Sequence, residues 1–183
     1  KLKGDKKRPV VFVFPSIADE LPPILERLMA SKLNKLGYHA VIAKLVEDIA
    51  DTKRSVEKID DFFIRSTIAF KQVLDQIEKD LQVNTKKVFA MGTSLGGIRT
   101  VMAIATEQRI KKAVVYVAVA NLPEILATSR VNIIEDYKKA KMKELEISST
   151  DEFKELLKSK IKIDPLDYAK LIKTEDIQMY LTS

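Results

Sequence analysis

Short unbroken hydrophobic runs alternate along this chain with longer stretches in which hydrophobic residues recur about every three to four positions. Residues 10–14 form a β-branched and aromatic run with no polar alternation, which is typical of a strand buried on both faces of a parallel sheet. Residues 87–91 and 113–119 predict two more strands, and 113–119 is the strongest apolar run. Two further strands are predicted over residues 38–45 and 177–181.

The stretches between the first four predicted strands, taken in chain order, predict three helices. One is expected to end at Gly37, a second covers residues 55–81, and a third spans residues 98–105. We expect each helix to turn its apolar face toward the sheet. The apolar positions that define the first two helices are Leu25, Leu28, Met29 and Leu33, and then Val56, Ile59, Phe63, Val73, Leu74, Ile77 and Leu81.

Residues 122–173 form the longest helical stretch. Ser149 stands three residues before Glu152, which is the spacing of a capping box, and Asp164 before Pro165 predicts another helix start. The apolar residues of this stretch suit two roles, either packing the helices onto the sheet or lining an acyl pocket. They include Ile125, Leu126, Ile133, Ile134 and Met142.

The alternation of strands and helices places the chain in the α/β class. We expect a mostly parallel, doubly wound sheet of about five strands. The helical stretch 122–173 would be an insertion between the last two strands. A length of 183 residues fits a single domain over residues 1–183.

The segment 92–97, Gly-Thr-Ser-Leu-Gly-Gly, joins the third predicted strand directly to a helix. Its G-x-S-x-G pattern in a strand–turn–helix context is that of a nucleophile elbow, in which a sharp turn exposes the serine hydroxyl. Ser94 is therefore the candidate nucleophile. The backbone N–H of Leu95, at the start of the helix, is the candidate donor to a developing oxyanion.

Three of the five glycines in the chain lie in this segment, at Gly92, Gly96 and Gly97. Glycine used so sparingly elsewhere indicates that the backbone needs it here for close approach or unusual dihedral angles. We expect a Cβ at Gly92 or Gly96 to collide with a neighbouring strand or helix.

Other glycine-rich motifs fit less well. A dinucleotide-binding turn requires G-x-G-x-x-G, and a phosphate-binding loop requires Gly-Lys followed by Ser or Thr. Here Ile98 and Arg99 follow Gly97. The remaining alternative is a plain Gly/Ser turn that joins a strand to a helix.

With this motif in place, the sequence resembles the α/β-hydrolase family. The resemblance implies a second oxyanion donor in the loop after the first strand, at Ser16 or Ile17, and a helical cap over the active site formed by residues 122–173. Beyond the segment 92–97, it rests on the strand at residues 10–14 with its Pro15-Ser16-Ile17 turn, on residues 37–39, on the strand at 112–119 and on residues 164–183.

The family's catalytic acid and histidine follow the serine in the chain. The one histidine, His39, precedes it, at the start of a strand and at the expected opposite end of the sheet, so we interpret it as structural. Within the chain, Glu124, Asp136 and Asp164 are the possible catalytic acids, although Asp164 fits better as a helix N-cap. We therefore expect the acid and the histidine beyond Ser183, and both ends of the chain to be cut short relative to the family.

The leading hypothesis is a serine hydrolase that acts on a carboxylic ester or a related small-molecule acyl substrate through Ser94. The alternative is a catalytically inactive module that uses the fold for binding. A third option, acyl transfer to an acceptor other than water, uses the same residues.

Composition narrows the partners and cofactors. The absence of cysteine excludes a thiolate metal site, and neither a metal nor an organic cofactor is expected. The net charge of +6 comes from lysines interleaved with acids, which indicates solvated helix faces rather than a nucleic-acid site. No apolar run approaches the ~20 residues of a membrane span. The first residue is Lys and not Met, so the compartment stays open, with the cytoplasm as the default, and so does the oligomeric state.

Overall fold

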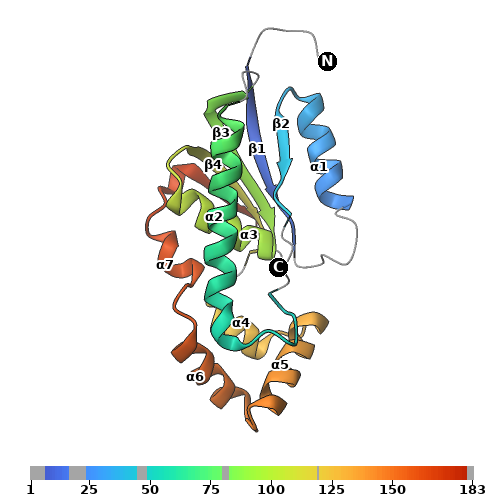
Figure 1. The fold of residues 1–183 in the computed structure, drawn as a ribbon, viewed down its shortest axis with the longest axis vertical. Helices are drawn as coiled ribbons and strands as arrows, with labels where there is room; N and C mark the ends of the chain where they lie inside the picture. Colours follow the sequence, from blue (N-terminus) through green and yellow to red (C-terminus); the bar gives the residue numbers. More distant parts are fainter. Residues whose placement is uncertain (1–6, 17–23, 45–48, 80–82, 119, 181–183) are drawn as a thin grey trace.

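A computed structural model describes residues 7–16, 24–44, 49–79, 83–118 and 120–180. Its centre is a five-stranded sheet with the strand order β2-β1-β3-β4-β5, in which every neighbouring pair is parallel (Figure 1). This confirms the predicted fold class. The strands are β1 (Arg8–Phe14), β2 (His39–Ile42), β3 (Val83–Thr93), β4 (Ile110–Tyr116) and β5 (Ile177–Tyr180).

Helices flank the sheet, with α1 beside β2 on one side and α2 and α3 on the other (Figure 1). Four helices lie between β4 and β5, which confirms a helical insertion at that place in the chain. The helices are α1 (Ile24–Lys35), α2 (Ile59–Ile77), α3 (Leu95–Thr106), α4 (Leu122–Thr128), α5 (Asn132–Glu144), α6 (Thr150–Lys160) and α7 (Pro165–Ala169), with short 3₁₀ turns at Val56–Lys58 and Thr174–Asp176.

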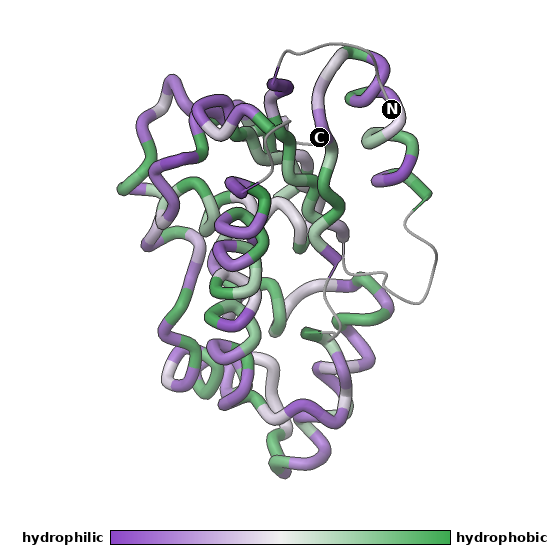
Figure 2. Tube along the Cα trace, turned by 45° about the horizontal axis from the view of Figure 1, so that its top comes forward, coloured by the Kyte–Doolittle hydropathy of each residue, from purple (hydrophilic) through white to green (hydrophobic). Residues whose placement is uncertain are grey.

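Aromatic packing joins the centre of the sheet to α2. The side chains of Phe12 and Phe14, on β1, meet the ring of Phe70 edge to face at centroid distances of 4.8 and 5.5 Å. Leu74, one turn further along α2, is fully buried in the same cluster. Figure 2 shows the resulting pattern, in which α2 alternates between hydrophilic and hydrophobic positions along its length.

The helical insertion has a core of its own that continues into α2 and α3. Tyr137, Phe153 and Leu157 are fully buried in a cluster that includes the N-terminal turns of α2 and the first turns of α3. Of the two roles open to the apolar residues of the insertion, the structure favours packing. Leu126 is buried in this cluster, and Ile133, Ile134 and Met142 pack against it.

Both predicted helix caps in the insertion are confirmed. The Ser149 side chain accepts a hydrogen bond from the backbone N–H of Glu152 at 3.1 Å. The Asp164 carboxylate accepts from the N–H of Leu166 at 2.9 Å, and also from the N–H groups of Asn121 (3.1 Å) and Leu122 (2.5 Å). Asp164 thus ties the start of α7 to the start of α4.

The predicted apolar face of the first helix is wrong at two of its four positions, since Met29 and Leu33 are half-buried but Leu25 and Leu28 are not. Leu25 and Leu28 are 50% and 59% exposed, whereas Glu26 is only 6% exposed and is the buried residue of α1. Glu26 faces the end of β1 because its carboxylate accepts a hydrogen bond there from the backbone N–H of Ser16. The spacing of apolar residues does not reveal such a contact. Val73 on α2 is likewise exposed rather than part of the apolar face.

The predicted fourth strand is placed too far along the chain. It runs over Ile110–Tyr116, and Val117 has a positive φ of 50°, which a strand does not allow. The apolar run from Ala113 therefore continues past the strand and into the turn that leads to the insertion. Val114 and Tyr116 are half-buried, so β4 is not covered equally on both faces.

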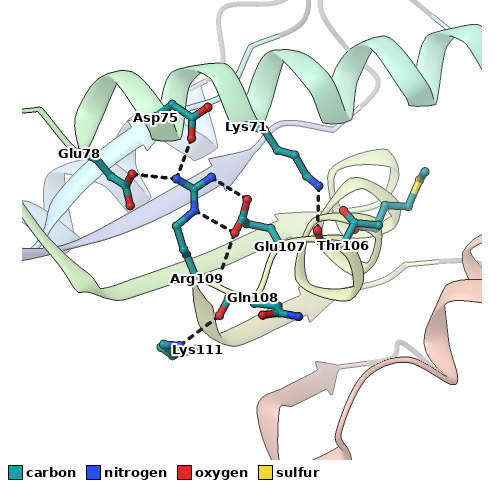
Figure 3. A network of polar contacts seen from close by, with 9 residues as sticks. Lys71, Asp75, Glu78, Thr106, Glu107, Gln108, Arg109 and Lys111 are labelled. Carbon is teal, nitrogen blue, oxygen red and sulfur yellow. Dashed lines mark hydrogen bonds and ion pairs between the residues drawn. The ribbon is translucent and has the colours of Figure 1, made fainter.

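An ionic network fixes the C-terminal half of α2 to the turn between α3 and β4 (Figure 3). Arg109 donates to both carboxylate oxygens of Glu107, at 2.9 and 2.7 Å, and contacts Asp75 at 2.7 Å and Glu78 at 3.0 Å. Hydrogen bonding to Arg109 lowers the pKa of Glu107, although burial opposes the shift. The folded state therefore stabilises the charged form of Glu107.

We expect Glu107→Gln to lower the free energy of unfolding at pH 7 by about 1–3 kcal/mol, because it removes a charged acceptor from a partly buried arginine. A lowered pKa in the folded state means that this stability is present above the unfolded-state pKa and is lost as pH falls through the folded value. Urea unfolding from pH 7 down to pH 3 should therefore show a shallower acid loss in the variant.

Glu135→Gln is the matched control for this prediction. Its carboxylate forms an i,i+4 pair with Lys139 on the surface of α5, and such pairs contribute little. The free energy of unfolding should stay nearly unchanged in that variant. Equal losses in the two variants would contradict the assigned role of the Arg109 network.

Candidate active site

Ser94 occupies a strained turn between the end of β3 and the start of α3. Its dihedral angles, φ 55° and ψ −121°, are those of the first central residue of a type II′ turn, where glycine is usually found. Its N–H donates to the carbonyl of Tyr116 at 3.0 Å, and its carbonyl accepts from the N–H of Ile98 at 3.2 Å. The backbone is thus held on both sides of a half-buried serine.

Close backbone contacts explain the glycines around Ser94. A Cβ on Gly92 would meet the carbonyl of Gly96 and would lie 2.6 Å from Oγ1 of Thr100. A Cβ on Gly96 would meet the carbonyl of Phe14 and would lie 2.6 Å from that of Pro15. The first turn of α3 therefore packs directly on the end of β1.

Gly97 brings the same turn against β4 and the residues that follow it. A Cβ there would lie 2.7 Å from Cβ of Ala118 and 3.1 Å from Cγ1 of Val115. The start of α3 is thus fixed between the carboxyl ends of β1 and β4, and Ser94 lies at the carboxyl edge of the sheet. In open α/β sheets this is the edge at which ligands bind.

The predicted oxyanion donors come from two elements that this packing brings together. Leu95 is the first residue of α3, and the first N–H groups of a helix have no acceptor within the helix. Ser16 follows the end of β1, and its N–H donates to Oε1 of Glu26 at 3.4 Å. Ile17 lies outside the described residues.

His39 lies at the opposite edge of the sheet from Ser94, as the sequence predicts. It is the first residue of β2 and is level with Val10 of β1, which in turn is level with Val88 of β3. Ser94 comes six residues after Val88, which corresponds to about 20 Å along a strand. His39 is therefore far outside the reach of a general base for Ser94.

Two of the three internal acids have structural partners in the insertion. Glu124 on α4 forms an ion pair with Lys154 of α6, and hydrogen bonding to Glu124 raises the pKa of that lysine. Asp164 caps two helix starts, and Asp136 is exposed on α5. The structure does not bring any of these three carboxylates to Ser94 through a hydrogen bond among the described residues.

The sequence does not predict two buried charged residues near the Ser94 turn, Glu26 and Arg99. Glu26 stands on α1 among leucines, and Arg99 lies in the apolar run of α3. A lone charge on a helix that is otherwise apolar is the signal that marks Arg99.

Within the described part of the chain, no three His, Asp or Glu side chains gather as a metal site would require. No described helix is long and apolar enough to cross a membrane.

These features define an α/β-hydrolase fold. The chain is similar to acetyl xylan esterase 1 from a Thermoanaerobacterium species, with a TM-score of 0.61 and 18% identity over 98% of this chain and 61% of the esterase. It is similar to the α/β hydrolase GrgF from a Penicillium species, with a TM-score of 0.58 and 13% identity over 95% of this chain and 71% of GrgF.

A third similar structure is the acylaminoacyl peptidase of Pyrococcus horikoshii, with a TM-score of 0.61 and 17% identity over 98% of this chain and 28% of the peptidase. The chain thus spans less than two thirds of the esterase and of the peptidase. No protein-family model matches the sequence, and the search of curated proteins found no significant match. At these identities, the similarity establishes the fold.

Proposed function

We propose that this chain carries the nucleophile of a serine hydrolase that cleaves a carboxylic ester or a related acyl compound. The observation that carries the proposal is the strained φ of 55° at Ser94, between a buried strand and a helix start. Backbone strain of about 1–3 kcal/mol persists where the surrounding structure enforces it, and it concentrates at functional sites. The enforcing contacts here are the close approaches at Gly92 and Gly96.

In the proposed reaction, Oγ of Ser94 attacks the acyl carbonyl, the alcohol departs, and water later hydrolyses the acyl-serine. The N–H of Leu95 donates to the oxyanion, with help from the dipole of α3. A second donor comes from the loop after β1, at Ser16 or Ile17. In the present conformation the Ser16 N–H already has the Glu26 carboxylate as acceptor, so its use requires that carboxylate to give way.

The one histidine of this chain, His39, lies about 20 Å from Ser94 along the strands, so it does not supply the general base. We propose that a histidine and an acid beyond Ser183 complete the proton transfer, and that the α4–α7 insertion borders the substrate site. Helices α4, α5 and α6 of that insertion lie beyond the carboxyl ends of the strands (Figure 1).

The test is hydrolysis of p-nitrophenyl esters, from acetate to laurate, by the intact protein, which includes the residues proposed to follow Ser183, and by its Ser94→Ala variant. We expect hydrolysis by the wild type and its loss in the variant. Equal activity of the two proteins would overturn the role of Ser94. Methanol added as a competing acceptor separates hydrolysis from acyl transfer, because only an acyltransferase would form the methyl ester as its main product.

A further inference from the structure

Arg99 is a buried arginine one turn beyond the Ser94 turn, and the proposed chemistry gives it no role. It stands on α3 and is 5% exposed. Taking a guanidinium out of water costs several kcal/mol unless its donors are satisfied. The contacts that hold Arg99 are therefore informative about what the arginine does.

The guanidinium of Arg99 joins three elements at the carboxyl edge of the sheet. Its Nε donates to Oγ of Ser66 on α2 at 2.8 Å, and Nη2 donates to the carbonyl of Ala43, just after β2, at 2.9 Å. Its central carbon lies over the ring of Phe14, at 4.8 Å from the centroid. Arg99 therefore fixes α3 to α2 and to the ends of β1 and β2.

The contact with Phe14 matters because Phe14 is followed by Pro15 and Ser16, the start of the loop that supplies the second oxyanion donor. The backbone of the same two residues, Phe14 and Pro15, packs against Gly96 of α3. One helix thus holds the end of β1 twice, through the backbone at Gly96 and through the ring at Arg99. The position of Leu95 relative to Ser16 depends on both contacts.

Lysine cannot reproduce this arrangement. A guanidinium is planar, presents donors in fixed directions and stacks on aromatic faces, whereas an ammonium is a compact, strongly hydrated point charge. The hydrogen bonds of Arg99 to Ser66 and Ala43 and its stacking on Phe14 depend on the properties that distinguish arginine from lysine.

We infer that Arg99 is a positioning residue for the oxyanion hole: it sets the separation between the Ser94–Leu95 turn and the loop after β1. This inference rests on the proposed function. It predicts that loss of Arg99 weakens transition-state stabilisation while leaving ground-state binding of an ester intact. Misplacement of a reacting group by about 1 Å can cost on the order of 10²-fold in rate.

The experiment compares wild type, Arg99→Lys and Arg109→Lys in the intact protein, using p-nitrophenyl acetate hydrolysis and the second-order rate of labelling by a fluorophosphonate. Arg99→Lys should lower kcat and the labelling rate about 10–100-fold, with KM within about threefold of the wild-type value. Arg109→Lys disturbs the network at the far end of α3, so it should lower Tm and leave kcat unchanged.

Four outcomes would each overturn either the positioning role of Arg99 or the proposed function. Wild-type kcat and labelling in folded Arg99→Lys would overturn the positioning role, and so would equal falls of kcat in both arginine variants. If Arg99→Lys does not fold, Ser66→Ala removes one partner of Arg99 and should lower kcat several-fold, whereas unchanged kcat would overturn the inference. A wild type that neither hydrolyses esters nor reacts with the probe would overturn the proposed function itself.

Discussion

Ser94→Gly should abolish ester hydrolysis and at the same time stabilise the folded protein. Loss of a serine nucleophile costs on the order of 10⁶-fold in kcat. The dihedral angles of Ser94 belong to a region that glycine adopts without strain. Relief of about 1–3 kcal/mol of strain, offset by the greater entropy of glycine in the unfolded chain, should raise the free energy of unfolding by about 1 kcal/mol.

Ser94→Ala is the control that separates the two effects. Alanine removes the hydroxyl but keeps a Cβ at the same dihedral angles, so hydrolysis should be lost without the gain in stability. Chemical unfolding of the three proteins measures the difference. Equal stabilities of the glycine and alanine variants would contradict the claim that the turn holds Ser94 in a strained conformation.

Gly96→Ala should destabilise the protein severely. The added Cβ would enter the carbonyl groups of Phe14 and Pro15, which are backbone atoms of a central strand end and cannot rotate away as a flexible side chain does. Forcing atoms into a packed interior costs about 1–3 kcal/mol, and we expect a loss of about 3 kcal/mol or more here. Any folded fraction should have lower kcat, because the clash pushes β1 away from α3.

Gly37→Ala is the matched control for this second variant. Gly37 has a φ of +90° and nothing within 4 Å of a Cβ built on it. Alanine there adds conformational strain of about 1 kcal/mol without a collision and far from Ser94. Urea unfolding should rank Gly96→Ala well below Gly37→Ala in stability. A Gly96→Ala variant as stable as Gly37→Ala would show that the end of β1 yields easily.

Sequence patterns predicted the sheet because strands buried in a parallel sheet keep unbroken apolar runs. Each of the five strands overlaps its predicted range, although β3 extends the predicted range 87–91 to Val83–Thr93. The largest errors come from positions where a specific contact or a backbone turn outweighs the hydrophobic pattern. Glu26 is buried because it accepts the Ser16 N–H, and Val117 leaves the strand through a left-handed turn.

The candidate site was predictable only in part. The glycine spacing around Ser94 predicts a turn with close backbone approach, since few other needs explain that residue type there. The lone charge of Arg99 on an apolar helix marks the residue but not its role, because its partners Ser66 and Ala43 are 33 and 56 residues away and only the folded chain brings them together. The same holds for the Arg109 network, which joins Asp75 of α2 and its C-cap Glu78 to a turn that follows α3.

The most direct test of a nucleophilic Ser94 is to treat the intact, folded protein with a fluorophosphonate and locate the adduct by peptide mass spectrometry. We expect a single adduct on Ser94, absent from Ser94→Ala and lost when the protein is unfolded before treatment. Folded protein that carries no adduct, or carries it on another residue, would show that Ser94 is not the nucleophile.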